Sequence, residues 1–290
     1  MSDFDEVYND FENNKREFDK EKYIEFKRQE KQEVYDLLDK ISTNVVENNK
    51  AFLNYLNSQS KFEGYSVGNA LLVSAQAPYA IKVKDIDAWN EQGLYLKKSP
   101  NKIKILEPGD QYMREDGSTG INYNVKYVYD ISEVKTKQKI RIMRYDDKLL
   151  LKAFLNSSYA KVEIVNEIPN TNKKALYDKE QEVLYIARGA EAPNIFYDVT
   201  TALATQEIEI NSELDKFKVE CVSYMLCKKY NIDVSKFDII VPDELKGLEA
   251  KEIRNELEPM RDAMENVNAR MQGFIRSISR ENKEKPSTVR

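Results

Sequence analysis

The sequence predicts an α+β protein in which N-terminal helices and a small antiparallel sheet precede a mainly helical half with a short sheet. Three observations lead to this expectation. Residues 18–41 contain no glycine or proline and repeat apolar side chains at helical spacing. Residues 102–131 carry two stretches typical of strands, separated by turn residues. After residue 146 the chain starts again, and helical patterns dominate up to about residue 278.

The N-terminal half is expected to contain several helices before its sheet. A second amphipathic helix covers residues 41–59, and a short apolar helix covers residues 69–75 and ends at Pro78. Residues 86–93 form a further short helix, with Gly93 as its C-cap. Alternating residues 102–106 and the aromatic, β-branched residues 123–131 predict two strands, with turns at 108–110 and 115–120.

The C-terminal half is expected to be mainly helical. Helices are predicted at residues 149–155, twice within 194–231, and at 246–278. Residues 162–165 and 183–187 are rich in Val, Ile, Leu and Tyr and predict two strands. We therefore expect four parts: a charged helical extension (1–50), a first domain (51–145), a second domain (146–279) and a flexible tail (280–290).

Composition excludes several classes of site. The 290 residues include no histidine, so histidine acid–base catalysis, histidine-activated nucleophiles and most zinc sites are excluded. Only Cys221 and Cys227 could supply thiolates, and we expect two buried free thiols in a reducing compartment. We therefore expect no enzyme activity, no catalytic residue, no metal and no cofactor. No apolar run approaches the ~20 residues that span a bilayer, and the N-terminus lacks a signal-peptide pattern. Both features favour a cytoplasmic protein without a membrane partner.

The charge is unevenly distributed. The whole chain has a formal net charge of -5, but residues 97–152 contain thirteen Lys or Arg and eight Asp or Glu. A basic segment inside an acidic chain is where a polyanion would bind.

A resemblance to a known family starts in the first domain. Residues 65–80 read Tyr-Ser-Val-Gly-Asn-Ala-Leu-Leu-Val-Ser-Ala-Gln-Ala-Pro-Tyr-Ala, and Trp89, Gly93 and the pair Lys97 and Lys98 follow in order. With the strand at 103–106 and the segment 127–132, this pattern resembles the N-terminal domain of ArdC-type anti-restriction proteins. The glycine-rich turn that follows the two lysines in that family is absent here.

The resemblance implies a single-stranded DNA-binding domain, of a kind found on conjugative plasmids and transposons. Tyrosine and tryptophan side chains could stack on unpaired bases, and lysines could neutralise phosphates without reading sequence. Asn69 and Gln76 could contact a base edge or a phosphate. The candidate nucleic-acid-binding residues are Tyr65, Asn69, Gln76, Tyr79, Lys82, Lys84, Trp89, Tyr95, Lys97, Lys98, Lys102 and Lys104.

Structural roles compete with these assignments. A lone tryptophan in a small helical segment packs in a core more often than it stacks on a base, and we favour that role for Trp89. Asn69 and Gln76 could simply tie loops together. The lysines are the stronger candidates, although any one of them alone could be a solvated charge.

The second half resembles the metallopeptidase-like domain that follows in such proteins. The family's His-Glu-Leu-Ala-His helix corresponds to Thr201, Ala202, Leu203, Ala204 and Thr205. Glu220 corresponds to the later glutamate that completes the zinc site. Threonine hydroxyls are poor zinc ligands, and Ala202 cannot take a proton from water. The resemblance therefore implies a zincin-like fold with a vestigial site, in which we expect Glu220 to hydrogen-bond Thr201 or Thr205.

Three functions remain open. The favoured one is a non-enzymatic, single-stranded DNA-binding protein of a conjugative or mobile element, with anti-restriction activity. The alternative is a protein-interaction module in which the N-terminal helix or the vestigial cleft binds a partner and DNA plays no part. Mimicry of DNA by the acidic N-terminus is a variant of that alternative. A magnesium-dependent nuclease is least favoured, because no Asp/Glu cluster has convincing ligand spacing.

Overall fold

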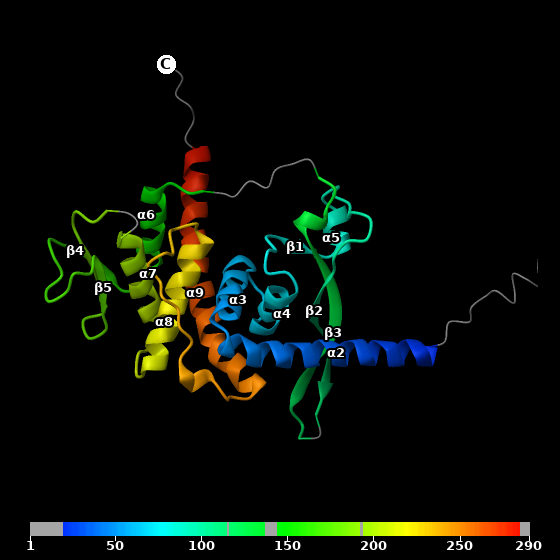
Figure 1. The fold of residues 1–290 in the computed structure, drawn as a ribbon. Coiled ribbons are helices and arrows are strands. Elements are labelled where there is room, and N and C mark those ends of the chain that lie inside the picture. Colours follow the sequence, from blue (N-terminus) through cyan, green and yellow to red (C-terminus); the bar gives the residue numbers. More distant parts are fainter. Residues whose placement is uncertain (1–19, 115, 137–143, 192–193, 285–290) are drawn as a thin grey trace, which may run out of the picture.

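The computed structural model describes residues 20–114, 116–136, 144–191 and 194–284, and it confirms the α+β class (Figure 1). The N-terminal half contains α2 (Lys20–Glu47), α3 (Asn49–Lys61), α4 (Val67–Gln76), β1 (Val83–Lys84), α5 (Ile86–Asn90), β2 (Ile103–Met113) and β3 (Thr119–Asp130). The C-terminal half contains α6 (Asp147–Ser157), β4 (Lys161–Val165), β5 (Ala175–Asp178), β6 (Val183–Ala187), α7 (Asn194–Glu207), α8 (Glu213–Lys229) and α9 (Ala250–Glu284). Two short 3₁₀ turns lie at Ile131–Glu133 and Asp243–Leu245.

Polar caps set where the helices begin. The Asn48 side chain accepts hydrogen bonds from the amides of Lys50 and Ala51, and this cap separates α2 from α3. Ser66 caps α4 and Ser212 caps α8 in the same way. The helix expected at residues 41–59 is therefore two helices, because Asn48 takes an extended conformation between them.

The first sheet is antiparallel and has the strand order β1-β3-β2. Its long hairpin, β2–β3, crosses α2 and extends well past it (Figure 1). The turn expected at residues 108–110 is wrong: β2 continues through it, and the register shifts between Pro108 and Gln111 as a bulge. Pro108 keeps its place opposite Tyr123, and the bulge that follows it bends the strand. The pattern also missed the two-residue strand β1.

The second sheet has the order β4-β6-β5, with β4 and β6 parallel and β5 and β6 antiparallel. Strand β5 was not predicted, because its four residues lie in a polar segment without clear alternation. The sheet lies at the outer edge of the molecule next to α7 (Figure 1).

The two halves share one main core. Buried residues of α2, α3 and α4 belong to the same hydrophobic cluster as those of α6 to α9. Helix α3 packs on α8, and α2 packs on α9, so both contacts cross the expected boundary at residues 145/146. That boundary falls directly before α6, whereas the one at 279/280 falls inside α9. Residues 1–19 of the expected extension (1–50) and residues 285–290 of the expected tail lie outside the described residues.

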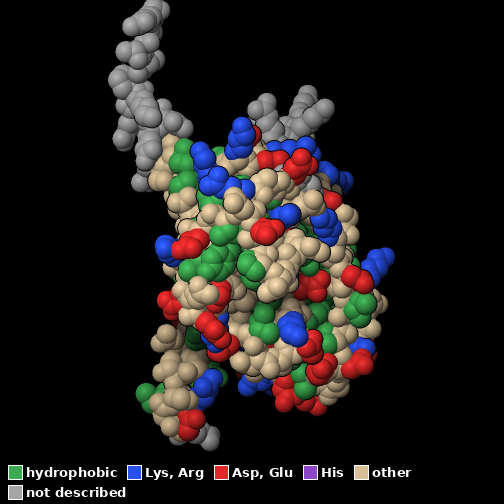
Figure 2. Space-filling view, turned by 90° about the vertical axis from the view of Figure 1, so that its left-hand side faces the viewer, with side chains coloured by type: hydrophobic (Ala, Val, Ile, Leu, Met, Phe, Trp, Pro, Cys, Tyr) green, Lys and Arg blue, Asp and Glu red, His purple; other side chains and the backbone are tan. Residues whose placement is uncertain are grey.

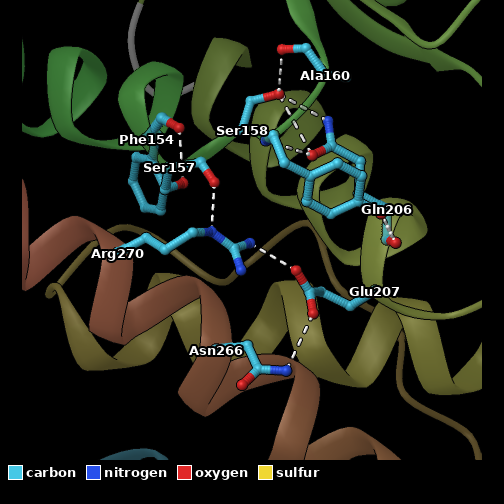
Figure 3. A network of polar contacts seen from close by, with 9 residues as sticks. Phe154, Ser157, Ser158, Ala160, Gln206, Glu207, Asn266 and Arg270 are labelled. Atoms are coloured by element: carbon cyan, nitrogen blue, oxygen red, sulfur yellow. Dashed lines mark hydrogen bonds and ion pairs between the residues drawn. The ribbon is translucent and has the colours of Figure 1, made fainter.

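A polar network joins α6, α7 and α9 (Figure 3). The Arg270 guanidinium donates to the Ser157 carbonyl and to the Glu207 carboxylate, both at 2.5 Å. Asn266 donates to the other Glu207 oxygen at 3.1 Å. The Gln206 side chain bonds Ser158, in the loop that leads to β4. This network fixes the end of α7 against the long C-terminal helix.

Two expectations from the composition can be compared directly with the structure. Cys221 and Cys227 are both free and buried in α8, as predicted. Among the described helices, none is long and apolar enough to cross a membrane.

Candidate nucleic-acid interface and the contact between helices α7 and α8

One face of the first sheet combines lysines with tyrosines. Lys84 lies directly opposite Tyr129, and Lys104 lies directly opposite Tyr127, so each pair projects from the same side of the sheet. The Lys102 ammonium lies 4.5 Å from the centroid of the Tyr127 ring. We call this surface the basic–aromatic face; it comprises Lys82, Lys84, Lys102, Lys104, Tyr127 and Tyr129.

Trp89 lies beneath the basic–aromatic face and is fully buried. Its indole nitrogen donates a 3.0 Å hydrogen bond to the Tyr129 carbonyl. The ammonium groups of Lys82 and Lys84 lie 5.9 and 5.6 Å from its ring centroid. Its inclusion among the base-stacking residues is therefore wrong, because no face of the ring is free to meet a base. The structural role expected for a lone tryptophan is confirmed.

A second group of candidates lies at the exit from β3. An isolated antiparallel bridge between Leu96 and Val134 holds the segment 95–98 against residues 132–135. The Lys97 ammonium donates to the Ser132 carbonyl, and Lys98 is exposed. Tyr95 is 62% exposed, the most open of the predicted stacking residues.

Backbone hydrogen bonds connect the basic–aromatic face to the second group of candidates. The Lys82 carbonyl accepts a 2.9 Å hydrogen bond from the Ile131 amide, next to the Ser132 carbonyl that holds Lys97. The Asp130 carboxylate fixes the same corner by accepting from the amides of Ile81 and Lys82. Burial raises the pKa of Asp130, but these backbone hydrogen bonds outweigh it and the pKa is lowered.

Asn69 and Gln76 have structural partners. The Gln76 amide nitrogen donates to the Lys104 carbonyl and its oxygen accepts from the Lys104 amide, at 2.9 and 3.0 Å. Asn69 makes the same pair of bonds with Leu106. The two side chains of α4 thus occupy the edge of β2 that no strand covers. This agrees with the structural alternative, and we leave both residues out of the binding surface.

Tyr65 and Tyr79 do not join the basic–aromatic face. Tyr65 packs on Phe62 with 5.6 Å between ring centroids, in a cluster that includes Val83 and Val128 from the opposite side of the sheet. It borders a groove of about 350 Å³ that is also lined by Asp85, Glu107 and Lys126. Lys126 pairs with both carboxylates, at 2.9 and 2.6 Å. Tyr79 is 55% exposed and lies in the loop before β1.

The sequence analysis missed two residues of the basic–aromatic face. Tyr127 and Tyr129 were assigned to a strand but not to a site. The signal was present, because alternate residues of a strand share a face and Lys102 and Lys104 alternate in the same way on the neighbouring strand. Finding it required the register between β2 and β3.

Helices α7 and α8 hold the four positions of the expected vestigial site. Thr201 donates to the Tyr197 carbonyl at 2.8 Å and contacts the Ser223 hydroxyl at 3.1 Å. Thr205 donates to the Thr201 carbonyl at 2.9 Å. Ala202 is buried in the main core. The Thr201 hydroxyl therefore bonds its own helix and contacts α8, whereas the Thr205 hydroxyl bonds only within α7.

Glu220 does not bond either threonine, so that part of the expectation is wrong. Glu220 is half-buried, and its charge interacts with those of Asp238 and Tyr197. Burial raises the pKa of Glu220, and the negative charge of Asp238 raises it further. The hydroxyl contacts between α7 and α8 are made by Ser223, one turn further along α8 than Glu220. The Ser223 hydroxyl lies 2.6 Å from the Thr200 hydroxyl and 3.1 Å from that of Thr201.

Taken together, these features define an α+β protein with a basic–aromatic sheet surface in one half and a hydroxyl-bonded helix pair in the other. No protein-family model matches the sequence, and no curated protein matches it. The fold is similar to two crystal structures of the antirestriction ArdC protein from plasmid R388. The metal-free one has a TM-score of 0.51 at 11% identity and covers 84% of this chain and 98% of its own. The Mn(II)-bound one has a TM-score of 0.54 at 14% identity and covers 82% and 99%. The chain therefore has an ArdC-like fold.

The α7–α8 contact does not fit a divalent metal. Among the described residues, no group of three or more His, Cys, Asp or Glu side chains could hold a metal ion. The charge of Asp238 acts on Glu220, and the hydroxyls of Thr201 and Thr205 already have protein partners. Two carboxylates without further free donors are fewer than Mn²⁺ or Mg²⁺ sites provide. No chemical step is therefore assigned to this contact.

Proposed function

We propose that this chain is a non-enzymatic, single-stranded DNA-binding protein of a conjugative or other mobile element, and that it acts against restriction. In this proposal the C-terminal half is a catalytically inactive relative of zincin-type metallopeptidases and supports the DNA-binding half. The observation that carries the proposal is the basic–aromatic face.

The chemistry of that face suits an unpaired strand. Tyr127 and Tyr129 are half-buried, so part of each residue remains accessible. Bases that are not paired can stack on such rings for ~1–3 kcal/mol each. Lys82, Lys98 and Lys102 are exposed around them and can neutralise phosphates without reading sequence.

The rest of the proposal has separate support. The role against restriction is supported by the fold alone, because the similar structures are of an antirestriction protein. The inactive C-terminal half is supported by the absence of histidine from the sequence and by the occupied hydroxyls of Thr201 and Thr205.

The test is fluorescence anisotropy with a labelled single strand of mixed sequence and the matching duplex, each over a salt series. We expect the single strand to bind more tightly than the duplex and to dissociate as salt rises. The Lys97→Glu, Lys98→Glu double variant should lose most of this binding. Lys251→Glu is the matched control, because Lys251 is exposed on the first turn of α9 and is not one of the candidate DNA-binding residues.

A second candidate function is the binding of a protein partner. It is favoured by the exposed apolar residues near the start of α2: Tyr23, Ile24 and Phe26 are 48, 56 and 57% exposed. Such a group on a projecting helix is typical of a docking surface. If the wild type does not bind single strands at low salt, this candidate replaces the first. If the double variant binds them as the wild type does, Lys97 and Lys98 lie outside the binding surface.

A further inference from the structure

Three lysines converge on one cavity between the two halves of the molecule. The cavity has a volume of about 430 Å³ and lies between the C-terminal ends of α3 and α8 and the segment before β1. Among the described residues its lining consists of Ser60, Lys61, Ile81, Lys228, Lys229 and Asn231, none of which is a carboxylate.

The three ammonium groups are held to different degrees. The Lys61 ammonium donates to the Ala80 carbonyl at 3.1 Å, and the Lys229 ammonium donates to the Ser60 carbonyl at 3.4 Å. Lys229 is also 3.8 Å from Glu63. Lys228 is exposed and has no side-chain hydrogen bond or ion pair within the described part of the chain. At least one cation of the cavity is therefore available to a ligand.

The positive charge is incompletely balanced. Burial lowers the pKa of Lys61, and repulsion from Lys228 lowers it further against the opposing effect of Asp130. Burial also lowers the pKa of Lys229, although Glu63 and Glu265 act in the other direction. An anion in the cavity would relieve this repulsion and would favour the charged form of both amines.

The cavity continues the proposed DNA-binding surface. Lys61 bonds Ala80, two residues before Lys82 of the basic–aromatic face. Ile81 lines the cavity, is 46% exposed and is held by Asp130, the residue that also fixes Lys82. Along the chain, the cavity and the first lysine of the face are therefore neighbours.

We propose that this cavity binds a backbone phosphate of single-stranded DNA and so extends the binding surface from the sheet onto the C-terminal end of α8. The proposal rests on the proposed function. The cavity would recognise a phosphate group. We assign that phosphate to the nucleic-acid backbone, because the cavity adjoins the basic–aromatic face. Shape and charge, without base contacts, predict binding that is independent of sequence.

The Lys228→Glu variant tests the proposal, with Lys251→Glu as the control that makes the same change in net charge. Lys228 has no structural partner, so the variant should fold as the wild type does. We expect single-strand affinity to fall roughly tenfold in Lys228→Glu and the salt slope to decrease by about 1, with neither change in the control. The loss should be confined to strands long enough to reach from Lys97 and Lys98 to the cavity.

The outcomes separate this inference from the proposed function. If the wild type binds no single strand, the proposed function fails and this inference fails with it. If the wild type binds and Lys228→Glu matches Lys251→Glu, only the inference is overturned. A second experiment measures the shift in melting temperature that inorganic phosphate causes in the wild type and in Lys228→Glu, at constant ionic strength. If phosphate stabilises the wild type but not Lys228→Glu, while both bind DNA equally, the cavity is a site for free phosphate and the backbone proposal is wrong.

Discussion

Asn69 and Leu106 are joined by two hydrogen bonds that imitate the pairing of two strands. The Asn69 side chain donates to the Leu106 carbonyl at 2.8 Å and accepts from the Leu106 amide at 2.9 Å. Without this side chain the Leu106 backbone, at a nearly buried position, would lose both partners. An unpaired buried polar group costs about 1–3 kcal/mol.

We therefore predict that Asn69→Ala lowers the free energy of unfolding by about 2–4 kcal/mol, because two backbone groups lose their partners. Denaturant unfolding measures the change. Asn90→Ala is the matched control, since the Asn90 side chain is exposed, and it should stay within about 0.5 kcal/mol of the wild type. If Asn69→Ala leaves stability unchanged but weakens DNA binding, the residue contacts DNA and the structural role is wrong.

Trp89 offers a direct optical test, because it is the only tryptophan in the chain. The ring is fully buried and its nitrogen is bonded to Tyr129. We predict blue-shifted emission, little quenching by acrylamide, and no strong quenching when a saturating single strand is added. Strong quenching by DNA would mean that the ring becomes accessible to bases, which contradicts its position beneath Lys82 and Lys84.

Base stacking on the sheet is predicted to depend on Tyr127. Replacing it with leucine keeps an apolar side chain on the strand but removes the aromatic face. We expect the dissociation constant for a single strand to rise at least about fivefold, in line with ~1–3 kcal/mol per stacked base. Tyr185→Leu, on the second sheet, is the matched control and should bind normally. Equal affinity of the two variants would remove Tyr127 from the interface.

Local pattern was enough to predict the long elements and the fold class, but not the arrangement of the site. The helices around Val34, Phe52 and Leu257 follow from apolar spacing alone. The strands β1 and β5 could not be predicted from apolar spacing, because such short strands form only through pairing with their neighbours. In the same way, Tyr129 faces Lys84 only because of a register between segments 45 residues apart in the sequence.

The surface charges illustrate the same limit. The basic segment at residues 97–152 was evident from counting, but Lys104 pairs with Glu33 from α2 at 3.2 Å, and Lys126 pairs with two carboxylates. On the side of the molecule seen in Figure 2, Lys or Arg and Asp or Glu side chains are interspersed. Lysines that are free for a ligand, such as Lys98 and Lys228, differ from their neighbours only in tertiary contacts.

The network of Arg270 and Glu207 is predicted to stabilise the packing of α7 on α9. The Glu207 side chain is 10% exposed, so removal of Arg270 leaves a nearly buried carboxylate with only Asn266 as a partner. We expect Arg270→Ala to cost about 3–5 kcal/mol in thermal or denaturant unfolding. The double variant with Glu207→Gln should recover part of that loss, because the unpaired charge is gone. A double variant as unstable as Arg270→Ala would show that the arginine acts through Ser157 and packing and not through its pairing with Glu207.

The environment of Glu220 predicts a pH dependence with a definite sign. Its pKa is raised in the folded protein, chiefly by burial and then by Asp238, so the folded state binds this proton more tightly than the unfolded chain does. The ionised carboxylate therefore lowers stability above the folded pKa, and the penalty disappears as pH falls through that pKa towards the unfolded value.

Glu220→Gln should accordingly raise stability at neutral pH, by no more than about 1 kcal/mol because the half-buried group is partly screened by solvent. The gain should vanish in acid, where the wild-type carboxyl is itself protonated. Unfolding of both proteins across a pH series measures this, with exposed Glu244→Gln as the control. If the Glu220 carboxylate bound a metal ion, Glu220→Gln would lower stability at neutral pH when the ion is present, because the amide would no longer bind the metal. A loss of stability in Glu220→Gln that depends on added Mn²⁺ would therefore overturn the assignment of this helix pair as a site without metal.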